Sequence, residues 1–164
     1  MNDRLRLAKD LGADFTLNPE HDDIEHEISE ITSGKGPAVV FEATGDPDAV
    51  ITSFKVARAC GRVVLIASTR GETNNVNFYE DVHKKGLVII GAHNTARPLH
   101  ESSPHFWTMR DDCELVLRLI SQKRLLIAPL ISHRLSWENA PDAYEMLMKW
   151  DTKLLGVILD WSSV

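Results

Sequence analysis

Three apolar runs in this sequence each end in residues that include small or polar side chains, of the kind that let a ligand approach the backbone. In chain order these residues are Ala43, Thr44 and Gly45, then Ile66, Ala67 and Ser68, then Ala92, His93 and Asn94. In open α/β sheets, ligands bind outside the carboxyl ends of the strands, and a glycine there permits close approach. Thr44 and Gly45 therefore indicate a cofactor contact, although a plain strand-to-helix turn would also use a glycine.

The titratable residues do not form a recognisable catalytic or metal-binding pattern. Three histidines and one cysteine, namely His93, His100, His105 and Cys113, match no zinc signature in their spacing, and the polar loop between them can hold solvated histidines. Glu42 lies in an apolar strand, where an unpaired carboxylate is costly, so we predict a structural role with hydrogen-bonding partners. No G-x-S-x-G motif occurs, so a hydrolase has no specific support.

Strand-length apolar runs alternate with amphipathic segments through the first two thirds of the chain. Strands are predicted at residues 13–19, 39–45, 61–68 and 87–93, and helices at 2–11, 21–36, 46–60 and 77–86. Within the helix at 46–60, Val50, Phe54 and Ala57 are predicted to face inward. Strands that are apolar on both faces imply a parallel sheet covered on both sides by helices. The predicted fold class is α/β with a doubly wound parallel sheet.

The last third of the chain departs from this repeat. After a polar loop at residues 94–105, a helix is predicted from 106 to 123, with a buried stripe of Cys113, Val116, Leu117 and Ile120. A strand at 131–135, a helix at 138–148 and a strand at 157–161 follow. In the helix at 138–148, the residues predicted to face inward are Ala140, Ala143, Tyr144 and Leu147.

Composition excludes several classes of protein. The 164 residues carry a net charge of −6 without a basic run, which argues against nucleic acid as a partner. Cys60 and Cys113 form no C-x-x-C pair, which fits a reducing cytoplasm. No apolar stretch approaches the roughly 20 residues of a membrane span, and no signal peptide is expected, since the amino terminus is charged.

Five segments together resemble the zinc-type, medium-chain alcohol dehydrogenase family, which includes sorbitol and threonine dehydrogenases. They are RLRLAKDLGADFTLN, AVVFEATGDPDAV, ARACGRVVLIAS, LVIIGAHN and the closing pair HRLSWENAPDAYEML and LLGVILDW. Each segment alone is weak, but five in the family's order and spacing are specific. The resemblance covers essentially the whole chain.

The resemblance implies a partial Rossmann fold, a doubly wound sheet truncated at its N-terminus. The family's coenzyme domain has six parallel strands in the order 3-2-1-4-5-6, and Met1 falls just after the second of them. The pyrophosphate loop and the zinc ligands would then precede this chain, and no G-x-G-x-x-G occurs in it. Residues 1–125 are expected to form the NAD(P)-binding part. Residues 126–164 are expected to pack on a missing GroES-like catalytic domain.

The same resemblance assigns roles to the strand ends. It places Ala43, Thr44 and Gly45 near the adenine, and Ile66 to Ser68 and Ala92 to Asn94 near the nicotinamide carboxamide. It also places Arg4 near the adenosine ribose, although a charge on a helix's first turn is equally well explained by solvation. Three positions depart from the family's usual pattern: Ala67 stands where glycine is usual, His93 is unusual at its strand end, and Gly156 stands where many relatives carry a basic residue.

Two hypotheses about function remain open. In the first, the chain is part of an NAD(P)-dependent zinc-type dehydrogenase acting on a small alcohol or polyol, inactive alone because it lacks the zinc ligands and the pyrophosphate loop. In the second, it is a non-catalytic module that binds a nucleotide or assembles by strand pairing. Several relatives pair their sixth strand across a two-fold axis, so a homo-oligomer through the strand edge of residues 87–93 (LVIIGAH) is expected with either hypothesis.

Overall fold

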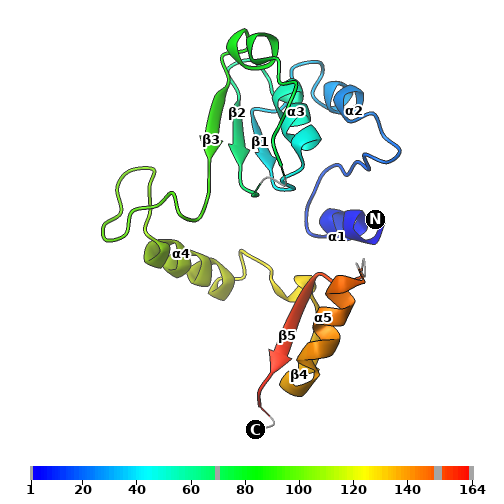
Figure 1. The fold of residues 1–164 in the computed structure, drawn as a ribbon, viewed down its shortest axis with the longest axis vertical. Coiled ribbons are helices and arrows are strands. Elements are labelled where there is room, and N and C mark those ends of the chain that lie inside the picture. The colour runs from blue at the N-terminus through cyan, green and yellow to red at the C-terminus, as the bar shows by residue number, and fades with distance from the viewer. Residues whose placement is uncertain (1, 69–70, 150–152, 163–164) are drawn as a thin grey trace. The chain divides into compact units, whose positions relative to one another are not determined.

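The computed structural model describes residues 2–68, 71–149 and 153–162, and helices alternate with strands between β1 and β3 (Figure 1). The helical elements are α1 (Asn2–Asp10), α2 (Ile24–Ile31), α3 (Pro47–Val56), η1 (Phe78–His83), α4 (Met109–Ser121), η2 (Ala128–Leu130), η3 (Trp137–Asn139) and α5 (Ala140–Met148). The strands are β1 (Val39–Glu42), β2 (Arg62–Leu65), β3 (Val88–Gly91), β4 (Ile131–Ser136) and β5 (Gly156–Asp160).

The pattern of internal contacts divides the chain into two units. One unit is Leu17–Met109, and the other combines Met1–Thr16 with Arg110–Val164. The division predicted at residue 125, between a coenzyme-binding part and carboxyl-terminal elements, stays a prediction.

A parallel sheet in the order β1-β2-β3 forms the centre of the Leu17–Met109 unit (Figure 1). Its register pairs Val40 with Val63 and Val63 with Ile89. Residues paired in this way point to the same face of a parallel sheet. The strands predicted at 39–45, 61–68 and 87–93 are thus confirmed, as is the parallel α/β class.

Helix α3 covers one face of this sheet. Asp46 caps its first turn by accepting a hydrogen bond from the Asp48 N–H, and Pro47 occupies the position where a missing N–H costs nothing. Val50, Phe54 and Ala57 are buried together with Val63 of β2, as the helical spacing predicted. This cluster is the core of the unit, and α2 lies against the outer side of α3.

The other face of the sheet is open in this unit. Phe41 of β1 and Val88 of β3 are 65% and 51% exposed, and Ile90 is also exposed. All three point away from the α3 side, because the register alternates faces along each strand. The expectation that helices cover both faces is therefore met on one face only.

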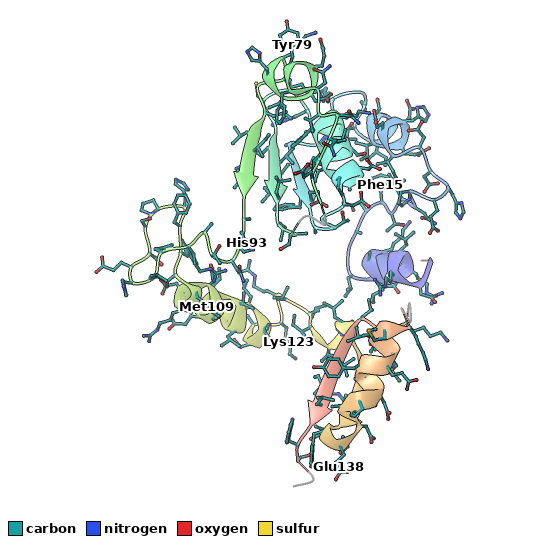
Figure 2. All side chains as sticks on the ribbon, viewed as in Figure 1. Phe15, Tyr79, His93, Met109, Lys123 and Glu138 are labelled. Atoms are coloured by element: carbon teal, nitrogen blue, oxygen red, sulfur yellow. The ribbon has the colours of Figure 1, made fainter. Side chains whose placement is uncertain are left out.

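The strand predicted at residues 13–19 does not form. This segment has no regular secondary structure, and Phe15 is 63% exposed (Figure 2). A strand is stable only when a neighbour satisfies its backbone N–H and C=O groups, and no described strand pairs with this segment. The prediction of this strand was wrong for the chain as described.

A β-α-β arrangement closes the chain. The predicted order of strand, helix and strand is confirmed, and the structure shows in addition that β4 and β5 pair in parallel, connected by η3 and α5. Ala143 and Leu154 are buried there, and the indoles of Trp137 and Trp161 stack at 5.0 Å between ring centroids. Tyr144 and Leu147, predicted to face inward, are exposed.

Helix α4 carries an apolar stripe without a cover in its unit. Cys113, Val116, Leu117 and Ile120 are all exposed, and Leu117 most clearly at 65%. The helix was predicted correctly, whereas the prediction that this stripe is buried was wrong. Helical spacing shows which side of a helix is apolar, but burial also requires an element that packs against that side.

Candidate functional site

The carboxyl end of β1 is organised around Glu42. This carboxylate is buried, and its Oε1 accepts hydrogen bonds from the Thr44 hydroxyl, from the Thr44 N–H at 2.7 Å and from the Gly45 N–H at 3.0 Å. The side chain therefore holds the turn between β1 and α3 in one conformation. The predicted structural role with hydrogen-bonding partners is confirmed.

These contacts also set the ionisation of Glu42. Burial raises the pKa of its carboxyl, but the hydrogen bonds from the Thr44 hydroxyl and from the N–H groups of Thr44 and Gly45 outweigh burial. The net pKa is below the ordinary value of 4.5. Glu42 is therefore a fixed negative charge at neutral pH rather than a proton donor.

Gly45 brings the end of β1 against the end of β2. Its φ is +72°, and a Cβ at this position would lie 2.1 Å from the Ser68 carbonyl oxygen. Only glycine fits such a close approach of two backbones. The predicted need for glycine at Gly45 thus has a direct cause within the protein, namely the contact with Ser68.

The sheet continues one residue beyond β2 and β3. The Ile66 N–H donates to the Glu42 carbonyl at 2.9 Å, and the Ala92 N–H donates to the Leu65 carbonyl at 2.9 Å. These two N–H groups are therefore occupied within the sheet. Ala67 is half-buried, whereas Ser68, Ala92 and Asn94 are exposed, so a ligand could still reach the carboxyl edge of the sheet at these positions.

His93 lies at the end of β3, in a turn that leaves the sheet (Figure 2). Its Nδ1 is 2.8 Å from the Thr95 hydroxyl and accepts a longer hydrogen bond from the Thr95 N–H at 3.3 Å. An Nδ1 that accepts a hydrogen bond leaves the ring proton on Nε2 in the neutral form. The exposed imidazole is held by its own turn, which matches the expected hydrogen-bonded histidine.

Arg4 belongs to the other unit. Its guanidinium donates to the Leu154 carbonyl at 3.0 Å and so ties α1 to the segment that leads into β5. The proposed contact of Arg4 with a ribose remains a prediction, and the hydrogen bond to Leu154 is the role visible in the structure.

A groove of about 560 Å³ runs along the free edge of β1. Its apolar walls come from α2, β1 and α3, and Ala43 and Thr44 lie at one end of it. The sequence analysis did not identify the contribution of α2 to this groove. Ile24 and Ile28, four residues apart, were nevertheless visible in the sequence as an apolar stripe. The lining residues are Pro19, Ile24, Ile28, Val40, Phe41, Glu42, Ala43, Thr44, Asp46, Asp48, Ala49, Thr52, Ser53 and Val56.

Neither a metal centre nor a membrane span is found in the part of the chain that the structure describes. There, no three side chains of His, Cys, Asp or Glu gather in a way that could hold a metal ion. Likewise, none of the helices formed by residues 2–68, 71–149 and 153–162 has the length and apolar character needed to cross a bilayer. The described residues therefore do not supply a zinc site.

Comparison with known proteins identifies relatives of both sequence and fold. The profile of the family described as zinc-binding dehydrogenase matches residues 1–109. L-threonine 3-dehydrogenase from Pyrococcus furiosus is 30% identical over 145 residues, and that from Bacillus subtilis is 33% identical over 149. Each alignment covers 88% of this chain and 38% of the relative.

Solved structures of alcohol dehydrogenases share the fold of this chain. An alcohol dehydrogenase from Thermotoga maritima has a TM-score of 0.78 at 26% identity, covering 97% of this chain and 40% of that one. An Escherichia coli alcohol dehydrogenase complexed with NADH has a TM-score of 0.78 at 18% identity, covering 98% of this chain and 42% of its own. The chain thus spans less than half the length of these relatives.

Proposed function

This chain belongs to the zinc-binding dehydrogenase family, and we propose that it supplies the carboxyl-terminal half of a coenzyme-binding domain in an NAD(P)-dependent zinc-type alcohol dehydrogenase. The carboxyl edge of the sheet is the proposed site. There, Ala43, Thr44 and Gly45 would meet the adenine side of the coenzyme. Ile66, Ala67 and Ser68, with Ala92, His93 and Asn94, would meet the nicotinamide side, and Arg4 the ribose.

One observation carries this proposal: the backbones of Gly45 and Ser68 meet at the carboxyl edge of a parallel sheet. In open α/β sheets, that edge is where nucleotide cofactors bind. The contact brings Gly45 and Ser68, which follow β1 and β2, next to each other at that edge. Exposed Ser68 and Asn94 would provide polar groups for an amide of the ligand.

The coenzyme, when bound, would accept a hydride from a small alcohol or polyol substrate. This chain's own residues would position the coenzyme through backbone contacts and would not exchange protons with substrate. Since the described residues do not fit a zinc site, no step through zinc is assigned to them. We expect the chain by itself to show no dehydrogenase turnover.

A fluorescence titration with NADH and NADPH tests the proposed site. Ala67→Asp places a carboxylate where the coenzyme would lie and is expected to weaken binding at least tenfold. Ala38→Asp makes the same change at the amino edge of the sheet and serves as the matched control, with unchanged binding expected. Equal affinities for both variants, or no NADH binding by the unaltered chain, would contradict the proposal.

Strand pairing is the second candidate function, favoured by the two free edges of the sheet. Strand β3 is exposed along its whole length, and β1 has the apolar groove beside it. Exposed edges present unpaired N–H and C=O groups that recruit another strand. We propose that the edge of residues 87–93 pairs with a second copy of the chain.

Proline substitution on β3 tests this pairing. The N–H groups of Val88 and Ala92 donate into the sheet, so by alternation the Ile89 N–H points outward. Ile89→Pro should abolish self-association in analytical ultracentrifugation, whereas Ile89→Ala, which keeps the N–H, should retain it. A monomeric unaltered chain, or an oligomer that survives Ile89→Pro, would count against the strand edge.

The two cysteines bear on location. Cys60 and Cys113 are both free and exposed, which suits a reducing compartment. We propose the cytoplasm on this ground.

A further inference from the structure

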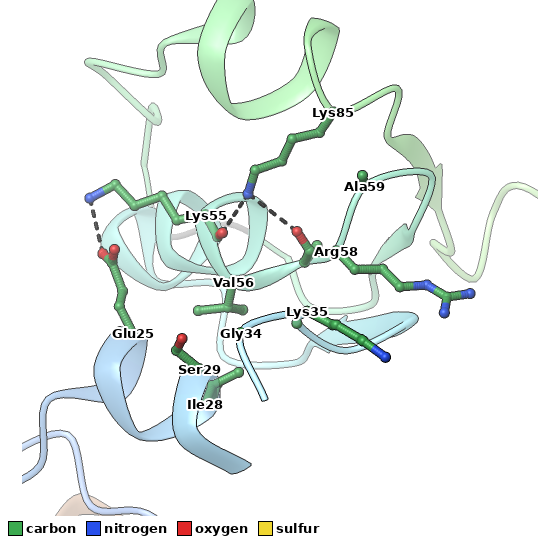
Figure 3. A pocket seen from close by; sticks show the side chains of 12 residues that line it. Glu25, Ile28, Ser29, Gly34, Lys35, Lys55, Val56, Arg58, Ala59 and Lys85 are labelled. Carbon is green, nitrogen blue, oxygen red and sulfur yellow. Dashed lines mark hydrogen bonds and ion pairs between the residues drawn. The ribbon is translucent and has the colours of Figure 1, made fainter. Parts of the chain in front are cut away.

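A second cavity lies at the opposite, amino edge of the sheet, away from the proposed coenzyme site. Its volume is about 400 Å³, within the roughly 300–1,000 Å³ of small-molecule sites. It is formed by α2, the turn after it and the end of α3 (Figure 3). The lining residues are Glu25, Ile28, Ser29, Gly34, Lys35, Gly36, Lys55, Val56, Ala57, Arg58, Ala59 and Lys85.

The lining is strongly cationic in a chain of net charge −6. Four of its side chains are positive, namely Lys35, Lys55, Arg58 and Lys85, and one, Glu25, is negative. Such a local excess raises the concentration of anions at the cavity. Whether it can bind one depends on which cations are already engaged within the protein.

The two negative groups at the cavity, the Glu25 carboxylate and the carbonyl end of α3, each interact with a lysine. Lys55 pairs with Glu25 at 3.0 Å, and this hydrogen bond and attraction raise the pKa of Lys55. The ammonium of Lys85 donates to the carbonyls of Phe54 at 3.0 Å, of Lys55 and of Ala57 at 3.2 Å. Lys85 thereby offsets the negative end of the α3 dipole, which would otherwise repel an anion.

Lys35 and Arg58 are the two remaining cations. Both side chains are exposed and extend to the same side of the cavity, whereas Lys55 turns to the other side toward Glu25 (Figure 3). Among the described residues, no acidic side chain forms an ion pair with either of them. The Ser29 hydroxyl also belongs to the lining and can donate a hydrogen bond.

We infer that this cavity binds the phosphate group of a small phosphorylated metabolite, held between Arg58 and Lys35. A guanidinium matches two phosphate oxygens with parallel N–H groups, and an ammonium adds a compact charge. The apolar wall of Ile28 and Val56 would accommodate the organic part of the ligand. This inference is independent of the coenzyme proposal, since it uses the other edge of the sheet.

Titration of the full chain with inorganic phosphate and with ribose 5-phosphate tests the inference. Backbone amide shifts are followed by NMR at ionic strength held constant with sodium chloride. The expected result is saturable shifts at Ser29, Lys35 and Arg58, with ribose 5-phosphate binding more tightly than phosphate. Lys35→Ser combined with Arg58→Ser should weaken binding at least tenfold.

The matched control removes one lysine and one arginine elsewhere. Lys9→Ser with Arg118→Ser changes the net charge equally in the other unit and should leave the affinity unchanged. Single variants Lys35→Gln and Arg58→Gln, each expected to weaken binding severalfold, keep the test valid if the double variant unfolds. Shifts that never saturate, or equal losses in the control, would overturn the inference and show charge screening only.

Discussion

Glu42 combines a buried side chain with a negative charge. Its carboxylate is buried yet stays ionised, because two N–H groups and one hydroxyl donate to Oε1. The depressed pKa in the folded state means that folding favours the charged form. The contribution of Glu42 to stability is thus present above the ordinary pKa of 4.5, and it is lost as the pH falls through the lower pKa of the folded state.

Replacing Glu42 by Gln should therefore act through pH as well as through stability. At pH 7, Glu42→Gln is expected to reduce the free energy of unfolding by about 1 to 3 kcal/mol, since a charged acceptor is lost. Urea unfolding across pH 3 to 7 should show that the difference from the unaltered chain shrinks below about pH 4.5. The exposed control Glu30→Gln should change neither quantity. A constant difference at every pH would contradict this assignment.

Substitutions at Gly45 and Gly34 distinguish two destabilising effects of adding a side chain, namely backbone strain and a steric clash. Both have positive φ, +72° and +74°, but only Gly45 faces a neighbouring backbone, the Ser68 carbonyl. Gly34→Ala should cost about 1 to 2 kcal/mol for the left-handed conformation alone. Gly45→Ala should cost clearly more, because β1 and β2 must separate at their ends. Urea unfolding of the two variants measures the difference, and equal costs would count against the close approach.

Among the helices, α3 is capped by a side chain at each end. One of these side chains is adjacent to the helix in sequence, and the other is distant from it. Asp46 caps the first turn from the adjacent position, and this capping was readable from the sequence Asp46-Pro47. Lys85 caps the last turn from 28 to 31 positions away. No local pattern could have indicated this second contact.

Lys85→Met should weaken α3 by removing that cap. Three carbonyls at the end of the helix would lose their donor, at a cost of about 2 kcal/mol in this partly buried setting. Lys84→Met is the matched control, since Lys84 pairs only on the surface with Glu80 and lies over Tyr79. Its cost should stay under about 1 kcal/mol. Chemical denaturation compares them, and a reversed order would refute the capping role.

Element type followed from the sequence better than burial did. Periodicity located α3 and its inward residues Val50 and Phe54, which are buried. The same method assigned buried stripes to α4 and α5 that the structure leaves exposed at Leu117 and Tyr144. Periodicity records the side on which apolar residues gather, and burial depends on a partner element that the segment itself does not encode.

At the scale of the whole molecule, large apolar side chains remain exposed on most elements. Phe41 and Val88 on the sheet, Leu117 on α4 and Tyr144 on α5 are examples. Fully burying one side chain of Val or Leu size is worth about 1.5 to 3 kcal/mol, so several such exposures equal a typical domain's stability. The chain by itself should be marginally stable or should depend on association.

A thermal melt followed by circular dichroism checks this expectation. The midpoint should lie below about 60 °C and should rise with protein concentration if association supplies the missing burial. Sedimentation at the same concentrations identifies the species that melts. A cooperative transition above about 60 °C from a dilute, demonstrated monomer would refute the expectation.

Patterns within short segments of the sequence were enough to predict the parallel α/β class and the family. Alternating apolar runs placed β1, β2 and β3, and helical spacing placed α3. The sequence also indicated that the turn after β1 uses Gly45, but it did not reveal the contact with Ser68 that requires this glycine.

The tertiary structure decided which of these segments find partners. It left residues 13–19 without a paired strand, set Gly45 against Ser68, and brought Lys35 and Arg58 to one side of a single cavity. The physical reason is common to all three. Strand pairing, backbone contact and the convergence of charges join groups far apart in the chain, so no single segment contains the information about its partner.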